Sequence, residues 1–215
     1  MSVSRETLEP ATLAAPTSPS LDGRAAERLD HFLRLLLDWN SRINLVARAD
    51  PPIIQRRHID DSLQLLPLLP INDGAMADLG SGAGFPGLVL AISSPRPIHL
   101  IESDHRKAAF LTEAAARLAL THVTVHATRI ESLHLPPLAA VTARALAPLD
   151  TLLGHAARLL APDGAAIFPK GRTAEAEITA ASQEWVFAIE RFASRTDPDA
   201  TILRLTNIRP QPYSP

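Results

Sequence analysis

The feature that most constrains the fold of this 215-residue chain is a glycine-rich segment, Asp78-Leu79-Gly80-Ser81-Gly82-Ala83-Gly84-Phe85-Pro86-Gly87. It places four glycines within ten residues, directly before an apolar run over residues 88–92. Glycine reaches positive φ and lets a ligand approach the backbone closely. Pro86 suits the first turn of a helix, where a missing N–H costs nothing. The segment predicts the end of a buried strand, a ligand-binding turn and a helix that begins near Phe85.

The chain that follows alternates short apolar runs with helical patterns. The expected strands are residues 75–79, 97–101, 123–126, 139–143 and 165–168, and the expected helices are residues 85–93, 106–120, 148–160 and 173–183. Such repeats are typical of a parallel sheet with helices on both faces. Residues 185–192 and 201–206 are also strand-like, and the short link between them favours an antiparallel pair. We therefore predict an α/β fold: a doubly wound, mostly parallel seven-stranded sheet with an antiparallel C-terminal hairpin.

The N-terminal third has a different pattern. Residues 1–20 are rich in proline and small polar residues and have no period, which indicates a flexible tail. Residues 21–70 predict a helical cap, with one amphipathic helix over 25–39 that Asp22 can cap. A second helix over 53–69 would end at two prolines. Residues 71–215 then form the ligand-binding domain.

Composition excludes several classes of protein. The hydrophobic fraction is 46%, the charged fraction is 20% and the net charge is −2, which together favour a globular protein over a nonspecific nucleic-acid coat. The absence of cysteine excludes disulfides and thiolate sites. No apolar run reaches about 18 residues, so we expect a cytoplasmic protein without a membrane segment. The eight histidines are scattered, and no metal site is expected.

Two nucleotide fingerprints overlap in the turn. Residues 82–87 fit the dinucleotide pattern G-x-G-x-x-G, whereas Gly80, Gly82 and Gly84 fit G-x-G-x-G after Asp78. Asp78 suits the ammonium group of a methionine moiety and would repel a pyrophosphate. Glu102, about twenty residues after the turn, can accept the ribose hydroxyls of either cofactor. The pattern favours S-adenosylmethionine over NAD.

A set of motifs in fixed order resembles a known family. These are Trp39-Asn40, Arg57-His58-Ile59-Asp60-Asp61-Ser62, Gly84-Phe85-Pro86-Gly87, Arg144-Ala145 and Lys170-Gly171. Over about residues 33–171 the chain is similar to the bacterial small-subunit ribosomal RNA methyltransferase G family, also called glucose-inhibited division protein B. Val46 and Asp60 depart from the residue types usual in that family, and the proline-rich tail has no counterpart.

The resemblance implies a class I methyltransferase-like fold and transfer of a methyl group from S-adenosylmethionine to the N7 atom of one guanine in 16S ribosomal RNA. It also implies cofactor contacts at Gly80, Phe85, Ile130, Glu131 and Arg144. With the residues of the turn and second strand, the expected cofactor site comprises Asp78, Gly80, Gly82, Gly84, Phe85, Glu102, Ile130, Glu131 and Arg144.

Guanine N7 carries a lone pair and no proton, so this reaction needs no general base. Alignment of the reactants can supply roughly 7–11 kcal/mol of such a barrier. We expect Arg144 and Lys170 to position the base and its developing charge, and His58 with Asp61 to form a structural hydrogen bond to the glycine turn. The expected RNA-binding residues are Arg42, Arg56, Arg57, Lys170 and Arg172.

Two alternatives remain open from the sequence. One is a small-molecule S-adenosylmethionine-dependent methyltransferase in which the N-terminal helices act as a lid. The other is a non-catalytic RNA-binding assembly factor. The favoured partner is 16S ribosomal RNA or a precursor of the small ribosomal subunit, bound by a monomer.

Overall fold

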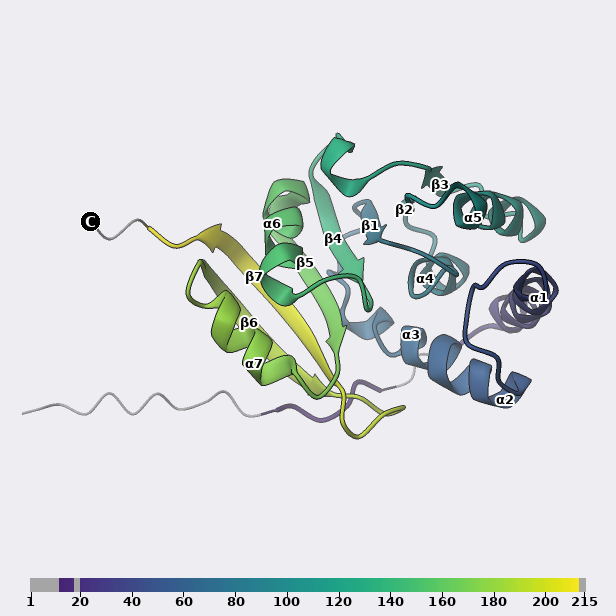
Figure 1. Ribbon diagram of the computed structural model, residues 1–215, viewed down its shortest axis with the longest axis horizontal. Coiled ribbons are helices and arrows are strands. Elements are labelled where there is room, and N and C mark those ends of the chain that lie inside the picture. The colour runs from purple at the N-terminus through teal and green to yellow at the C-terminus, as the bar shows by residue number, and fades with distance from the viewer. Residues whose placement is uncertain (1–11, 18–19, 213–215) are drawn as a thin grey trace, which may run out of the picture.

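The computed structural model describes residues 12–17 and 20–212. Within them a seven-stranded sheet has the order β3-β2-β1-β4-β5-β7-β6 (Figure 1). The strands are β1 (Met76–Leu79), β2 (Ile98–Ile101), β3 (Val123–His126), β4 (Leu138–Ala143), β5 (Leu160–Lys170), β6 (Trp185–Ala193) and β7 (Thr201–Pro210). Strands β1 to β5 pair in parallel, and β7 runs antiparallel to both β5 and β6. The predicted fold class, including the antiparallel ending, is confirmed.

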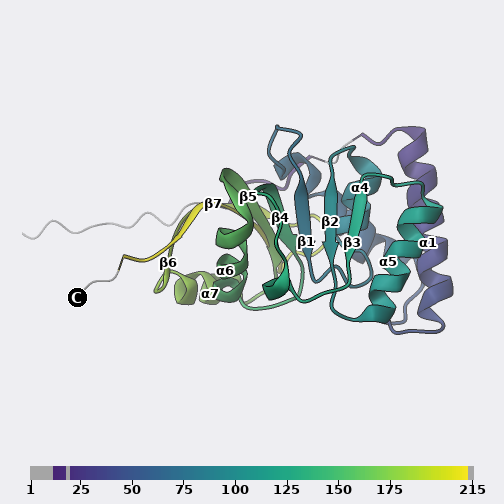
Figure 2. The same ribbon diagram turned by 90° about the horizontal axis from the view of Figure 1, so that it is seen from above.

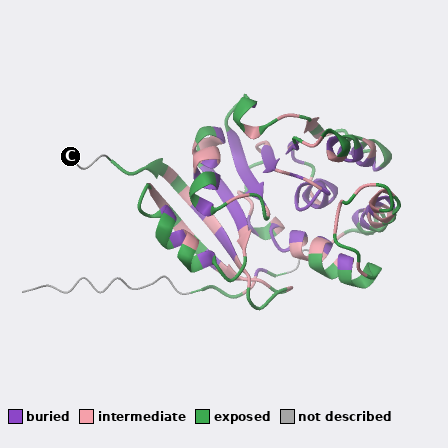
Figure 3. Cartoon of the chain, in the orientation of Figure 1, coloured by how far each residue is buried: buried purple, intermediate pink, exposed green. Residues whose placement is uncertain are grey.

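Helices cover both faces of this sheet (Figures 1 and 2). They are α1 (Gly23–Asn40), α4 (Gly87–Ser93), α5 (His105–Arg117), α6 (Leu149–Leu159) and α7 (Ala174–Ala181). On one face α4 and α5 share a core with α1, where Phe32 packs on Phe110 with ring centroids 6.4 Å apart. On the other face α6 and α7 cover a second core, and Figure 3 shows that the central strands between the two layers of helices are buried.

The sheet positions the site through its strand order. β2 and β4 lie on opposite sides of β1, and Leu79 at the end of β1 is in register with Ile101 and Ala143 at the ends of β2 and β4. In open parallel sheets, ligands bind at the carboxyl ends of the strands where the order reverses. The glycine-rich turn therefore lies at the topological switch point.

The prediction of one continuous second helix is wrong. Instead of one helix over 53–69, the chain forms α2 (Pro51–Ile54), a π-helical turn (Gln55–Asp60), α3 (Asp61–Leu63) and a 3₁₀ turn (Leu66–Leu68). Local polar groups contribute to the breaks: the Ser62 hydroxyl donates to the His58 carbonyl at 2.6 Å, and Pro67 has no N–H to continue a helix. Single π turns inside helices recur at functional sites.

Two further boundaries differ from expectation. α4 begins at Gly87 and not at Phe85, because the Gly87 N–H donates to the Asp78 side chain at 3.2 Å and Pro86 precedes the helix as its N-cap. β5 begins at Leu160 and not at residue 165, because Leu160 pairs with Leu138 across a bulge that absorbs the turn-forming residues 162–164.

Part of the predicted tail lies on the sheet edge. Leu13 bridges to Phe192 of β6, with its N–H donating to the Arg191 carbonyl at 2.7 Å. Residues 12–17 are therefore attached to the domain, whereas residues 1–11 and 18–19 of that prediction lie outside the described residues. Among the helices that the structure describes, none is long and apolar enough to cross a membrane.

Candidate active site

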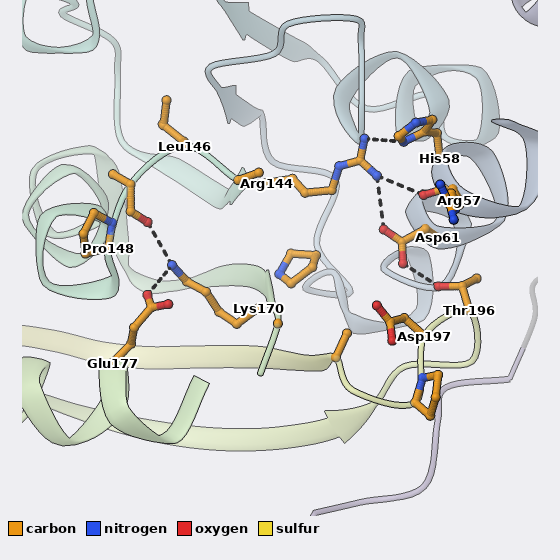
Figure 4. A pocket seen from close by; sticks show the side chains of 16 residues that line it. Arg57, His58, Asp61, Arg144, Leu146, Pro148, Lys170, Glu177, Thr196 and Asp197 are labelled. Atoms are coloured by element: carbon orange, nitrogen blue, oxygen red, sulfur yellow. Dashed lines mark hydrogen bonds and ion pairs between the residues drawn. The ribbon is translucent and has the colours of Figure 1, made fainter. Parts of the chain in front are cut away.

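Two cavities adjoin at the carboxyl edge of the sheet. The smaller, about 340 Å³, lies over the glycine-rich turn between the ends of β1 and β2. The larger, about 900 Å³, lies between β4, β5, the N-terminal helices and the β6–β7 loop (Figure 4). Arg144, Ala145 and Leu146 line both cavities. Ala145 has a φ of 50°, a conformation that non-glycine residues adopt rarely and that is concentrated at functional sites.

The small cavity contains most of the predicted cofactor residues. Its lining includes Gly80, Gly82, Glu102, Ile130, Glu131 and Arg144. Gly80 has a φ of 65°, and a Cβ atom there would lie 2.6 Å from Cδ1 of Leu146, so only glycine fits without displacing that side chain.

The Glu102 carboxylate is held by two backbone N–H groups. Oε2 accepts from the Gly82 N–H at 2.9 Å, and Oε1 accepts from the Asp104 N–H at 2.7 Å. Glu102 therefore ties the end of β2 to the glycine turn and still lines the cavity, as expected of a carboxylate that accepts ribose hydroxyls.

Sequence reasoning missed four polar residues that line the small cavity, namely Ser103, Lys107, Thr128 and Arg129. Their signal was position: two follow Glu102 closely, and two directly precede Ile130. A residue that follows a strand closely lies at the same edge of the sheet as the end of that strand. Each of the four could therefore have been predicted as a cavity residue from its neighbour.

The expectation that Asp78 faces the cofactor needs correction. Its side chain is fully buried and lies beneath the turn, where Oδ2 accepts from the Gly87 N–H and Oδ1 accepts from the Thr142 hydroxyl at 2.9 Å. Burial raises the pKa of this carboxyl to about 6, although these hydrogen bonds oppose the rise. Asp78 therefore braces the start of α4 against β4 and does not line either cavity described above.

Gly84 and Phe85 also lie outside the lining of the small cavity. Gly84 has a φ of 87°, and a Cβ atom there would lie 2.6 Å from Cδ1 of Leu88. The Phe85 ring is buried, stacks on His58 with centroids 4.9 Å apart, and lies 5.3 Å beneath the Arg144 guanidinium carbon. These two residues shape the turn and support Arg144.

Arg144 is anchored to the N-terminal helices. Nη1 donates to the Arg57 carbonyl at 3.2 Å and to Oδ2 of Asp61 at 3.3 Å, and Nη2 contacts Nδ1 of His58 at 2.9 Å (Figure 4). Among the described residues, His58 and Asp61 therefore bond to Arg144 at the end of β4 and not to the glycine turn, which corrects the expected partner. Within the described part of the chain, the Nε–H of Arg144 makes no hydrogen bond.

His58 is neutral in this arrangement. Arginine has no acceptor, so Nδ1 of His58 must accept from Arg144 and the ring proton must be on Nε2. Burial lowers the pKa of His58 to about 4, with a further lowering from the positive charge of Arg144. This histidine consequently has no free basic nitrogen near neutral pH.

Lys170 lines the large cavity, but its ammonium group is held by other protein groups. This corrects the expectation that Lys170 binds RNA. Its side chain is 9% exposed, and Nζ donates to the Ala147 carbonyl at 2.9 Å and to Oε2 of Glu177 at 2.7 Å (Figure 4). Oε2 of Glu177 also accepts from the Leu149 N–H at 3.0 Å. Lys170 therefore fixes the segment that connects β4 to α6.

The remaining predicted cations are dispersed. Arg57 lines the large cavity. Arg42 and Arg172 are exposed and pair with Asp38 at 3.2 Å and Asp199 at 2.6 Å, and neither lines a cavity at this edge, nor does the exposed Arg56.

Sequence reasoning also missed the β6–β7 loop, of which Thr196 and Asp197 line the large cavity. Their Thr-Asp-Pro-Asp sequence indicated a turn but not its position, because the loop reaches the site from a strand pair on the far side of β5.

Comparison with solved structures shows which fold this is. The fold resembles an O-methyltransferase from Bacillus cereus in complex with SAH, with a TM-score of 0.57 and 16% identity over 83% of this chain and 91% of that one. It equally resembles a ribosomal protein L11 methylase from Lactobacillus delbrueckii, with a TM-score of 0.57 and 15% identity over 75% and 81% of the two chains. This fold, with a glycine turn and carboxylate at its switch point, is that of the class I methyltransferases.

Sequence comparison defines the family. A family model described as rRNA small subunit methyltransferase G matches residues 25–196. A relative named ribosomal RNA small subunit methyltransferase G from Granulibacter bethesdensis is 51% identical over 90% of each chain, and one from Rhodospirillum centenum is 50% identical over 93% of this chain and 95% of its own. The chain belongs to the rRNA small subunit methyltransferase G family, as the sequence motifs indicated.

Proposed function

We propose that the protein transfers a methyl group from S-adenosylmethionine to the N7 atom of a guanine in 16S ribosomal RNA of the small subunit. One observation carries the proposal: a small cavity with adenosine-binding groups adjoins a large cavity, and both are lined by residues 144–146. Two substrates bound on either side of this segment would meet there. Family membership supports ribosomal RNA as the acceptor.

The small cavity has the donors and acceptors that the cofactor requires. Gly80 and Gly82 leave room for close approach to the backbone, and the Glu102 carboxylate, which accepts from the Gly82 N–H, would accept ribose hydroxyls. Residues 130 and 131, which line the same cavity, would flank the adenine. When bound, the cofactor supplies an electrophilic methyl group. Asp78, Gly84 and Phe85 act from beneath by holding the turn and Arg144.

The large cavity favours an acceptor atom without a proton. Its three carboxylates all accept hydrogen bonds: Asp61 from Arg144 and Thr196, Glu177 from Lys170, and Asp197 from the Asp199 N–H. His58 is neutral, and its Nδ1 is occupied by Arg144. None of these groups is placed to act as a strong base, which matches attack by guanine N7, whose lone pair is free.

RNA recognition would combine the shape of the large cavity with two arginines. A cavity of about 900 Å³ can admit a nucleotide that has left its stack. Arg57 and Arg144 line it, and guanidinium groups bind phosphate oxygens or the O6 edge of guanine. We also propose that the chain acts as a monomer in the cytoplasm, which sedimentation at assay concentration would test for the oligomeric state.

The decisive experiment gives the protein tritiated S-adenosylmethionine with small ribosomal subunits from a strain lacking this methylation, with free 16S RNA, or with RNA-free cell extract. We expect label in one guanine of the RNA, mapped by the chain cleavage to which N7-methylguanine is susceptible. Arg144→Ala should abolish transfer without a comparable loss of melting temperature. Label only in small molecules would support the small-molecule alternative, and binding without transfer would support an assembly factor.

A further inference from the structure

Asp61, at the start of α3, joins three parts of the molecule through one carboxylate. Oδ2 accepts from Nη1 of Arg144 at 3.3 Å, at the end of β4. Oδ1 accepts from the Thr196 hydroxyl at 2.6 Å, in the β6–β7 loop, and from Nε2 of Gln64 at 2.8 Å. The Asp61 side chain is 15% exposed. Hydrogen bonds to a charged group in such a setting are stronger than neutral ones, so the carboxylate restricts all its partners.

One end of this chain of bonds lines the large cavity alone, whereas the other end lines both cavities. Thr196 lines the large cavity and not the small one, and its loop is fixed to the same helix because the Arg195 N–H donates to Oε1 of Gln64 at 3.0 Å. Arg144 lines both cavities. A change in how Thr196 holds Asp61 therefore reaches a side chain that borders the cofactor cavity.

We propose that Asp61 is a positioning residue that couples the two cavities: the Thr196 hydroxyl fixes Asp61, and Asp61 fixes the Arg144 guanidinium in the orientation that the cofactor needs. This inference rests on the proposed function, since it takes the small cavity as the cofactor site. It follows that removing the Thr196 hydroxyl, which lines the large cavity, weakens cofactor binding in the absence of RNA.

The test measures S-adenosylhomocysteine binding by titration calorimetry, without RNA and without turnover. Thr196→Val and Thr196→Ala remove the hydroxyl, and Thr196→Ser keeps it. We expect the first two to weaken binding about fivefold or more, which is the lower range of coupling between sites, and the serine variant to bind as wild type does. Thr179→Val is the matched control, because that exposed hydroxyl on α7 bonds only to the Glu175 carbonyl among the described residues.

Two results would overturn the inference. One is unchanged affinity in both Thr196→Val and Thr196→Ala while wild type binds, which leaves the proposed function intact. The other is equal weakening in Thr196→Ser and Thr196→Val, which would assign the effect to packing. If wild-type protein does not bind S-adenosylhomocysteine, the proposed function fails and the inference fails with it. Melting curves of each variant separate these cases from a loss of folded protein.

Discussion

Lys170 provides the sharpest test of how the site is built, because the structure makes it a structural residue and the sequence suggested an RNA contact. Lys170→Met keeps the length of the side chain and removes the donor to Ala147 and Glu177. Breaking a buried ion pair costs about 3–5 kcal/mol. Since Glu177 is 23% exposed, we take the lower end, about 3 kcal/mol. For a chain of this size that lowers the melting temperature by roughly 6–12 °C.

The assay is thermal unfolding of five proteins: wild type, Lys170→Met, Glu177→Gln, the double variant and the control Arg172→Met. The double variant Lys170→Met/Glu177→Gln should be more stable than Lys170→Met alone, because it leaves no unpaired charge, and should show coupling of about 1–3 kcal/mol. Arg172→Met, which removes an 83% exposed cation, should cost less than about 1 kcal/mol. A Lys170→Met protein that melts with wild type but loses RNA binding would refute the structural role.

The pH dependence of this pair has a definite sign. Burial alone would raise the pKa of Glu177, but hydrogen bonds from Lys170 and Thr173 outweigh it and lower the pKa below its usual 4.5. A lowered carboxyl pKa contributes stability that is full above the unfolded value and is lost as pH falls through the folded value. The stability difference between wild type and Lys170→Met should therefore shrink on acidification below 4.5. A difference that stays constant into that range would count against the ion pair.

Two further predictions concern the glycine turn. Burial raises the pKa of Asp78 from 3.8 to about 6, which corresponds to a loss of about 3 kcal/mol in folding free energy when the carboxyl is charged. This loss is absent below pH 3.8 and complete above about pH 6. Asp78→Asn should therefore gain stability relative to wild type as pH rises through this window. Urea unfolding at both ends of the window measures this, and a constant difference would contradict it. Gly80→Ala should cost about 1–2 kcal/mol from its positive φ and should also weaken S-adenosylhomocysteine binding by displacing Leu146, as melting and calorimetry would show. Unchanged affinity would mean that Leu146 moves without consequence.

Much of the fold could be predicted from the sequence because its signals are local. The alternation of apolar runs with helical periods predicted the parallel sheet, and the short link over residues 193–200 predicted the antiparallel pair that the structure contains. The prediction of one continuous second helix was wrong because hydrophobic periodicity cannot show that the chain departs from α-helical hydrogen bonding at Gln55–Asp60.

The candidate site divides in the same way. Gly80, Gly82 and Glu102 were predictable, because spacing from a strand end fixes which edge of a sheet a residue occupies, and all three line the small cavity. The same reasoning placed Asp78 and Lys170 at that edge correctly but gave them the wrong partners. A strand end fixes position along the sheet, whereas the direction of the side chain depends on what packs beside it.

The sequence by itself determined the succession of strands and helices along the chain, the glycine turn and the family. It could do so because hydrophobic period, turn chemistry and motif spacing are properties of short stretches of chain. Only the tertiary structure decided that Asp78 turns inward to Gly87 and Thr142, that Lys170 is held by Glu177, and that Asp61 bonds Thr196 across 135 residues. These choices depend on burial and on donors and acceptors brought together from distant segments. A buried polar group must find a partner, and no local pattern names it.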